Sequence, residues 1–122
     1  MSKRTILVVE DYDDSREFMK FVLESYGYEV TEAVDGLEAV AEITRQLPDL
    51  VLMDMRMPRM DGLTATRIIR ETESKTKLPI LAVTANGKTY SKQAMEAGCN
   101  MMIQKPVDFD TLQPIIELYL SH

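Results

Sequence analysis

The chain has 122 residues, of which 45% are hydrophobic and 28% are charged, as is typical of one folded domain and not of a disordered or collagen-like chain. Its 20 Asp and Glu residues exceed its 14 Lys and Arg residues, and the resulting net charge of −6 disfavours direct DNA binding. The sequence contains no apolar run that could span a membrane, no secretory signal and only one cysteine, so we expect a cytoplasmic protein without membrane association.

Short apolar runs alternate along the chain with stretches of helical periodicity. The runs predict strands at Thr5–Val9, Tyr28–Ala33, Leu50–Met53, Ile80–Thr84 and Met101–Gln104. The stretches between them place apolar residues at i, i+3, i+4 and i+7, which predicts helices with one apolar stripe each. The stretch from 88 to 97 has the weakest apolar face.

Five strand–helix units predict an α/β fold of the flavodoxin-like (βα)5 type, a three-layer sandwich with a five-stranded parallel sheet. Thr5–Val9 and Leu50–Met53 are almost wholly apolar, as central strands should be. Tyr28–Ala33 carries two Glu residues and is predicted to be an edge strand. The common strand order for such a sheet is 2-1-3-4-5. We expect a single domain over residues 1–122, with a core from about 4 to 120.

Helix ends are marked by capping and turn residues. Asp14 with Glu17, and Asp35 with Glu38, have the spacing of a capping box. Gly27 and Gly98 lie where helices should end.

The last helix contains a proline, Pro114, which interrupts helix hydrogen bonding and clashes with the preceding turn. Either the helix bends at Pro114 or it begins late; we favour the late start, with Asp110 or Thr111 as its cap and Pro114 in its first turn.

Polar side chains follow four of the predicted strands. Ligands of such sheets bind beyond the carboxyl ends of the strands, at the point where the strand order reverses. Glu10 and Asp11 follow the first strand and Asp54 follows the third, so three carboxylates should converge there. Thr84 and Lys105 follow the fourth and fifth strands and lie to the side.

Mutual repulsion among three carboxylates favours a bound hard dication. Mg²⁺ prefers oxygen ligands and commonly combines one or two carboxylates with a phosphate oxygen. A fixed carboxylate such as Asp54, next to Mg²⁺ and Lys105, is suited to forming an aspartyl phosphate. The neighbouring Asp13 and Asp14 are better explained as acids in the first turn of a helix.

These residues resemble the receiver domain of bacterial response regulators. The resemblance rests on four segments and covers residues from about 4 to 120: Glu10-Asp11, Asp54-x-x-Met57-Pro58-x-x-Asp61-Gly62, Thr84-Ala85 and Lys105-Pro106.

The resemblance implies a role for each site residue. Asp54 would accept a phosphoryl group from a phosphohistidine on a sensor histidine kinase or a phosphotransfer protein. Mg²⁺ would bind Asp11, Asp54 and the Arg56 backbone carbonyl, with Glu10 acting through water. Thr84, followed by Ala85, and Lys105 would contact the phosphoryl oxygens, and Pro106 would follow Lys105 through a cis peptide bond.

The sequence departs from the family pattern at two positions. Glu10 stands where the family usually has Asp, which preserves the charge. Met102 stands where the family usually has Tyr or Phe, a ring that moves together with the Thr84 position. The usual two-residue switch, Thr84 with Met102, is therefore expected to be altered.

The resemblance also bears on partners. We expect a regulatory, non-enzymatic domain of the stand-alone type, monomeric or weakly dimeric, that contacts a downstream protein through residues 88–97, 101–104 and the last helix. An alternative is a receiver module of a hybrid histidine kinase or larger regulator.

Three other functions were weighed against the receiver hypothesis. A haloacid-dehalogenase-type phosphatase also uses a strand-end Asp, but needs a second Asp where Arg56 stands. A flavodoxin-like flavin carrier would have its phosphate repelled by Glu10 and Asp11. The methionines Met53, Met55, Met57 and Met60 offer thioethers to Cu(I), but core packing and an adaptable contact surface are the preferred explanation.

Overall fold

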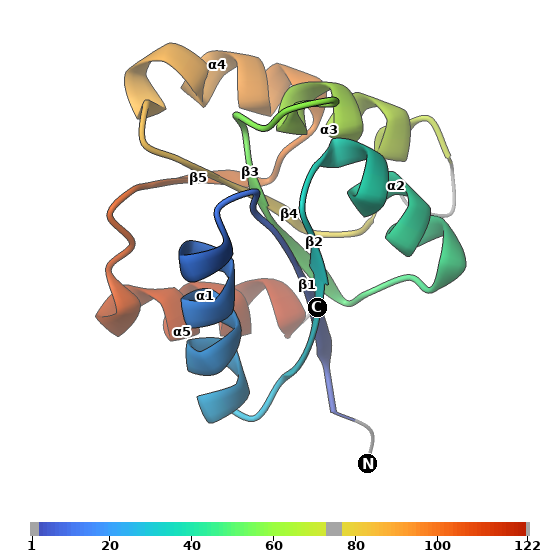
Figure 1. Cartoon of the computed structure of the whole chain (residues 1–122). Helices are drawn as coiled ribbons and strands as arrows, with labels where there is room; N and C mark the ends of the chain where they lie inside the picture. Colours follow the sequence, from blue (N-terminus) through green and yellow to red (C-terminus); the bar gives the residue numbers. More distant parts are fainter. Residues whose placement is uncertain (1–2, 73–76, 122) are drawn as a thin grey trace.

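The computed structural model describes residues 3–72 and 77–121 of the chain (Figure 1). Strands and helices alternate along this part of the chain. The strands are β1 (Thr5–Val9), β2 (Glu29–Ala33), β3 (Leu50–Asp54), β4 (Ile80–Thr84) and β5 (Met101–Gln104). The helices are α1 (Asp13–Ser25), α2 (Gly36–Arg45), α3 (Gly62–Arg70), α4 (Gly87–Ala97) and α5 (Phe109–Leu120).

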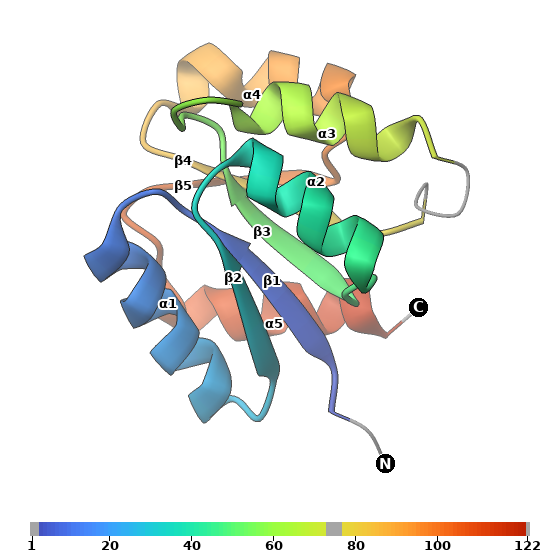
Figure 2. The same cartoon turned by 45° about the vertical axis from the view of Figure 1, so that its right-hand side comes forward.

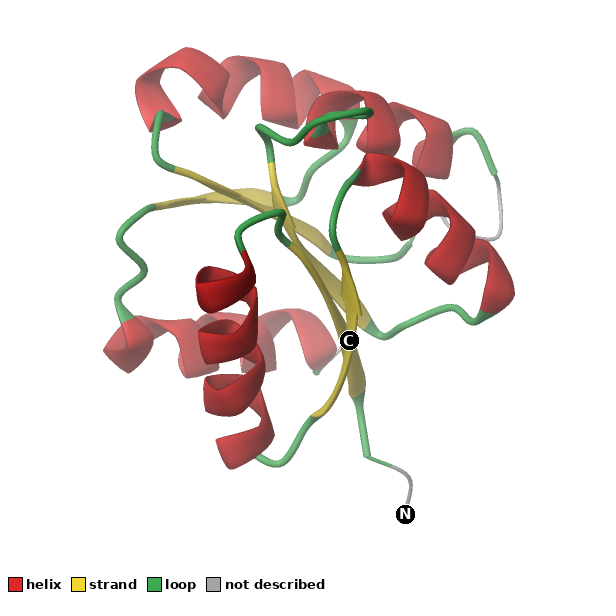
Figure 3. Ribbon diagram, in the orientation of Figure 1, coloured by secondary structure: helices red, strands yellow, loops and turns green. Residues whose placement is uncertain are grey.

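The strands form one parallel sheet in the order β2-β1-β3-β4-β5, which confirms the predicted order and the edge position of β2. Figure 3 shows the sheet as the layer between two sets of helices. Val9 of β1 is in register with Met53 of β3, and Asp54 is in register with Val83 of β4. The carboxyl ends of the three central strands therefore lie level with one another.

Helices α1 and α5 cover one face of the sheet, and α2, α3 and α4 cover the other (Figures 1 and 2). Successive residues of a strand point to opposite faces, so Ile6 and Val8 pack in the α1–α5 core while Leu7 and Val9 pack in the α2–α3–α4 core. Burial on both faces accounts for the continuous apolar runs. Each fully buried aliphatic side chain stabilises the fold by about 1.5–3 kcal/mol.

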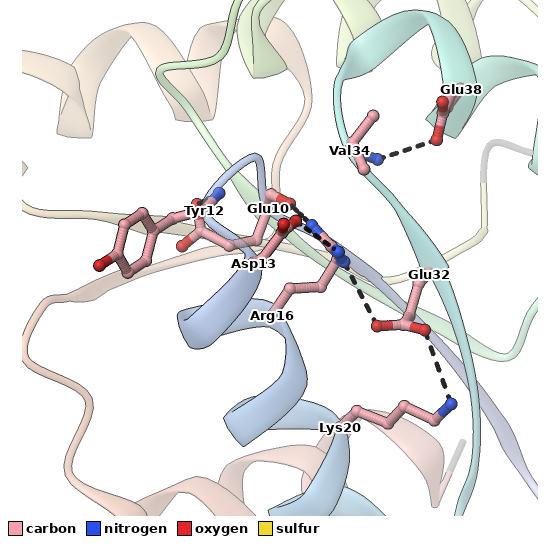
Figure 4. Close-up of polar contacts among 8 residues, drawn as sticks. All are labelled: Glu10, Tyr12, Asp13, Arg16, Lys20, Glu32, Val34 and Glu38. Atoms are coloured by element: carbon pink, nitrogen blue, oxygen red, sulfur yellow. Dashed lines mark hydrogen bonds and ion pairs between the residues drawn. The ribbon is translucent and has the colours of Figure 1, made fainter.

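The predicted start of α2 and end of α4 are confirmed, whereas the predicted start of α1 is wrong. Asp35 Oδ1 accepts a 2.9 Å hydrogen bond from the Glu38 amide. In return, Glu38 Oε1 accepts one of 3.0 Å from the Val34 amide, as Figure 4 shows. Gly98, with φ 115°, ends α4 in the left-handed conformation. Helix α1, however, begins at Asp13 without a side-chain cap, so Asp14 lies within its first turn.

Gly27 also behaves as predicted, with φ 98° directly after the last turn of α1. The left-handed conformation there lets the chain reverse into β2 without the steric cost that a side chain would add.

The predicted late start of α5 is wrong. Asp108 is the cap, its carboxylate accepts a hydrogen bond from the Asp110 amide, and the helix runs from Phe109 through Pro114. Leu112, Ile116 and Leu120 are buried against the sheet on both sides of the proline. Burial of three large side chains outweighs the roughly 3 kcal/mol that a proline costs inside a helix.

An ion pair ties the loop after β3 to the start of α2. Arg59 has φ 64°, a left-handed conformation that non-glycine residues rarely adopt. Its Nε donates a 2.6 Å hydrogen bond to Oδ2 of Asp35, a carboxylate that is only 1% exposed. The Gly36 amide also donates to the Met60 carbonyl at 2.8 Å. The loop that follows Asp54 is thereby fixed from outside the site.

The strained arginine generates a stability prediction. Arg59→Ala should lower the free energy of unfolding by about 1–3 kcal/mol, because buried Asp35 loses its charged partner. Arg59→Gly should be less destabilising than Arg59→Ala by about 1 kcal/mol, because glycine adopts positive φ without strain. Urea denaturation at pH 7 measures both, with exposed Arg67→Ala as a control expected to stay within about 0.5 kcal/mol of the parent.

The same ion pair gives the prediction a pH dependence. Burial raises the pKa of Asp35, but the Glu38 amide and the Arg59 guanidinium outweigh burial and leave the pKa below its usual value. A lowered folded-state pKa stabilises the fold above the unfolded pKa, and this contribution is lost as the pH falls. The difference between parent and Arg59→Ala should therefore shrink in acid; a difference that grows in acid would contradict the assignment.

Candidate functional site

Three carboxylates meet at the carboxyl ends of β1 and β3. One oxygen from each of Glu10, Asp11 and Asp54 lies within 4.8 Å of the other two. Asp54 ends β3, and Glu10 and Asp11 follow β1, its neighbour in the sheet. Glu10 and Asp54 are buried, whereas Asp11 is exposed. The structure thus brings together the three acids singled out from the sequence.

Lys105 neutralises part of this cluster. Its Nζ donates to Glu10 Oε1 at 2.7 Å and to Asp54 Oδ2 at 3.3 Å. Burial lowers the pKa of Lys105, but the Glu10 hydrogen bond and the Asp54 charge outweigh it, so the pKa lies above its usual value. The lysine is therefore held as an ammonium against two of the acids.

Among the described residues, the ion pairs of Lys105 reach Glu10 and Asp54 but not Asp11. Burial, followed by the hydrogen bond and charge of Glu10, raises the pKa of Asp11. Ionisation of Asp11 is therefore disfavoured, first by desolvation and then by its contact with Glu10. One ammonium group compensates only part of the negative charge of three carboxylates, so the site favours binding of an added cation.

The loop from β1 into α1 is held by Arg16, which the sequence analysis did not identify. Its guanidinium donates to the Glu10 backbone carbonyl at 3.0 Å and to Asp13 at 2.7 Å, and also reaches Glu32 of β2 at 3.3 Å (Figure 4). A basic residue one turn into a helix that begins with acids was the available signal. Only the fold, however, brings Glu32 and the Glu10 carbonyl to it.

The loop after β3 passes close to Asp54. The Arg56 amide donates to Asp54 Oδ1 at 3.2 Å, which orients the carboxylate. A Cβ at Gly62, the first residue of α3, would lie 2.3 Å from the Asp54 backbone carbonyl oxygen, so this close approach requires glycine. The Asp-Gly pair at 61–62 thus serves to bring α3 up against the phosphoacceptor candidate.

Thr84 lies next to the cluster, at the end of β4. It is buried, and its Oγ1 accepts a 3.1 Å hydrogen bond from the Asn86 amide beyond Ala85. Within the described ranges, its hydroxyl makes no hydrogen bond to Asp54. Its backbone carbonyl accepts from the Lys105 amide at 2.8 Å, which connects the ends of β4 and β5.

Two further expectations concern Pro106 and the methionines. The Lys105–Pro106 peptide bond is cis, as the family resemblance implied.

Met53 and Met55 are buried in the α2–α3–α4 core, and Met57 and Met60 pack against it. The thioethers are therefore accounted for by core packing, and nothing in their environment requires Cu(I).

The donor set favours a hard metal ion. The site offers carboxylate oxygens, and the Arg56 carbonyl belongs to the loop beside them. Mg²⁺ selects such oxygen ligands, whereas soft metals prefer sulfur or imidazole. The residues present fit a magnesium site. Lys105 adds a positive charge that can compensate a bound anionic group such as a phosphoryl group.

Comparisons with known proteins agree with this geometry. The family model described as the response regulator receiver domain matches residues 6–117. The chain is 36% identical over 120 residues to a 14.6 kDa protein of Leptolyngbya boryana, covering 98% of this chain and 92% of that protein. It is 42% identical over 112 residues to the CAI-1 autoinducer sensor kinase/phosphatase CqsS of Vibrio cholerae, covering 90% of this chain but only 16% of the kinase.

Solved structures share the fold over nearly the whole chain. The receiver domain of sensor histidine kinase PA1611 from Pseudomonas aeruginosa is 37% identical, with a TM-score of 0.93 over 99% of this chain and all of that one. That structure has a magnesium ion coordinated in its active-site cleft. Chemotaxis protein CheY4 of Vibrio cholerae is 27% identical, with a TM-score of 0.90 over 98% of this chain and all of that one.

The helices can be compared with what a membrane span requires. Among the helices of the described residues, none combines the length and apolar character that crossing a membrane requires.

The charge balance of the site predicts opposite effects of two substitutions. In the presence of a chelator, Asp11→Asn should raise the free energy of unfolding by about 0.5–2 kcal/mol, because it removes a disfavoured charge. Lys105→Met should lower it by about 1–3 kcal/mol, because Glu10 and Asp54 lose their counter-charge.

Denaturant midpoints measure both effects, and exposed Lys92→Met serves as the control for loss of a lysine. A clear destabilisation by Asp11→Asn would mean that Asp11 is structurally paired and that the excess-charge interpretation is wrong.

Proposed function

The chain belongs to the response regulator receiver domain family, and from this we propose that Asp54 accepts a phosphoryl group from a phosphohistidine. The observation that carries the proposal is the placement of Asp54 beside Glu10, Asp11 and Lys105. The donor would be a sensor histidine kinase or a histidine phosphotransfer protein. In the reaction, an Asp54 carboxylate oxygen forms the P–O bond while the P–N bond breaks and its electron pair returns to the imidazole.

Asp11, Asp54 and the Arg56 backbone carbonyl would hold Mg²⁺, and Glu10 would act through water. Once bound, the cation supplies charge neutralisation for the phosphoryl oxygens. The chain's own part is positional. The Arg56 amide orients Asp54, the Arg16 guanidinium fixes the Glu10 backbone, and Lys105 brings a positive charge to the Asp54 oxygen.

Thr84 would report the phosphoryl group to the rest of the domain. A phosphoryl group carries about −1.5 to −2 charges at neutral pH and accepts strong hydrogen bonds. It would draw the Thr84 hydroxyl inward, and the segment from Ala85 to Tyr90 would follow. Met102 is half-buried against the α2–α3–α4 core, so its flexible side chain can adjust with a small displacement.

The remaining expectations follow from this function. Residues 1–122 would act as one regulatory receiver domain in the cytoplasm rather than as an enzyme with its own substrate, monomeric or weakly dimeric. A downstream protein would bind the face made by α4, β5 and α5; Met95 of α4 and Leu118 of α5 are exposed apolar side chains on two of these elements. The competing phosphatase function still lacks its general acid, because Arg56 stands two residues after Asp54.

The phosphoacceptor assignment is tested with acetyl phosphate and Mg²⁺. The parent should gain the mass of one phosphoryl group, and Asp54→Asn should abolish the gain because an amide is a poor nucleophile. A chelator should block the reaction as well. Asp14→Asn, a matched change of an exposed acid in α1, should leave the modification intact; equal modification of the Asp54→Asn variant would rule out Asp54.

The altered switch is tested by methyl NMR with and without beryllofluoride, a phosphoryl mimic. Large shifts are expected for Thr84, and only a small shift for the Met102 methyl group, because methionine changes rotamer without a large displacement. Met101, which packs in the α1–α5 core, is the internal reference. A complete two-state inward move of Met102 coupled to Thr84 would contradict this prediction.

A further inference from the structure

Gln104, the last residue of β5, links the ends of β4 and β5. It is the register partner of Thr84 and directly precedes Lys105. Its side-chain Nε2 donates to the Ala85 carbonyl at 2.8 Å and to the Lys105 carbonyl at 3.2 Å. Its Oε1 accepts from the Gly87 amide at 2.9 Å. One amide group thus joins the backbones that carry the two proposed phosphoryl contacts.

This contact also serves as the N-terminal cap of α4. The first backbone amides of a helix have no partner within the helix. In the part of the chain described, the N-cap residue Asn86 makes no side-chain cap hydrogen bond, and its Oδ1 accepts instead from the Thr89 hydroxyl. Gln104 reaches across from β5 and accepts from the Gly87 amide, the first amide of the helix.

The start of α4 rests closely on β5. A Cβ at Gly87 would lie 2.1 Å from Gln104 Oε1 and 2.8 Å from Met102 Cε, so a side chain at this position would displace the ends of both. Helix α4 contributes few buried residues to the core, namely Gly87, Ala94 and Ala97. With so little apolar burial, polar contacts at its N-terminus carry a larger share of its anchoring.

We propose that Gln104 is a positioning residue that holds the Ala85–Gly87 segment in place and opposes the inward movement of Thr84. In the structure, Thr84 Oγ1 accepts from the Asn86 amide, in the middle of the segment that Gln104 holds at both ends. Thr84 cannot carry this segment inward while Ala85 and Gly87 remain bonded to β5. The proposal rests on the proposed function and adds an element that sets the threshold of the switch.

The test is Gln104→Met, which keeps the length of the side chain but removes all three hydrogen bonds. At saturating Mg²⁺, the rate constant of Asp54 phosphorylation by acetyl phosphate should rise about fivefold. Losing exposed hydrogen bonds should shift the equilibrium of Thr84 toward its inward position by about that factor. Beryllofluoride should bind more tightly by a similar factor. The Mg²⁺ dissociation constant should stay within about twofold, because no carboxylate is touched; a merely structural defect would instead lower the rate.

The matched control is Gln93→Met, an exposed glutamine on α4, which should leave rate and affinity unchanged. A folded Gln104→Met protein with an unchanged or lower rate would overturn the proposal while leaving Asp54 as the acceptor. Failure of the parent to gain a phosphoryl group would instead overturn the proposed function, and the proposed role of Gln104 with it.

Amide hydrogen exchange in the unsubstituted protein provides a measurement that does not depend on the variant's folding. Beryllofluoride should speed exchange at Gly87 several-fold and leave exchange at Ala94, in the middle of α4, unchanged. Retained protection at Gly87 would show that its hydrogen bond to Gln104 persists when beryllofluoride is bound, and would overturn the proposal.

Discussion

Electrostatic repulsion among three carboxylates at two adjacent strand ends is the constraint around which this domain is arranged. Parallel strands bring Glu10, Asp11 and Asp54 to one edge whether or not their charges are compatible. Lys105 offsets part of the repulsion from the end of β5, and Arg16 fixes the backbone from which Glu10 projects. The site is therefore prepared for added positive charge, at a cost in stability that the apolar sheet beneath it can sustain.

The loops on the two sides of Asp54 are held by interactions of different strength. After β3, a buried carboxylate and a strained arginine fix the loop, and breaking that contact would leave a buried charge without its partner. After β4, an exposed glutamine holds the loop, and water can replace each of its hydrogen bonds. This asymmetry suits one loop to hold the ligand geometry constant and the other to move in response to it.

Much of this arrangement could be predicted from the sequence, because it depends on alternation and on which residue ends each strand. Glu10, Asp54 and Lys105 were identifiable because the strand order brings strand ends together. The start of α5 was not, because burial of Leu112 and Ile116 outweighs the local effect of Pro114. Arg16 and Gln104 were missed for a related reason: their partners lie on other strands or loops, and neither residue has a distinctive local pattern.

The sheet also separates two apolar cores, one beneath α1 and α5 and one beneath α2, α3 and α4. Because side chains on opposite faces of a strand do not touch, changes in one core are nearly independent of changes in the other. Substitutions in the core beneath α2, α3 and α4 can therefore change the packing and the exposed surface of α4. The packing beneath α1 and α5 is left as it is. A two-sided sheet therefore allows the packing on one face to change while the packing on the other face stays as it is.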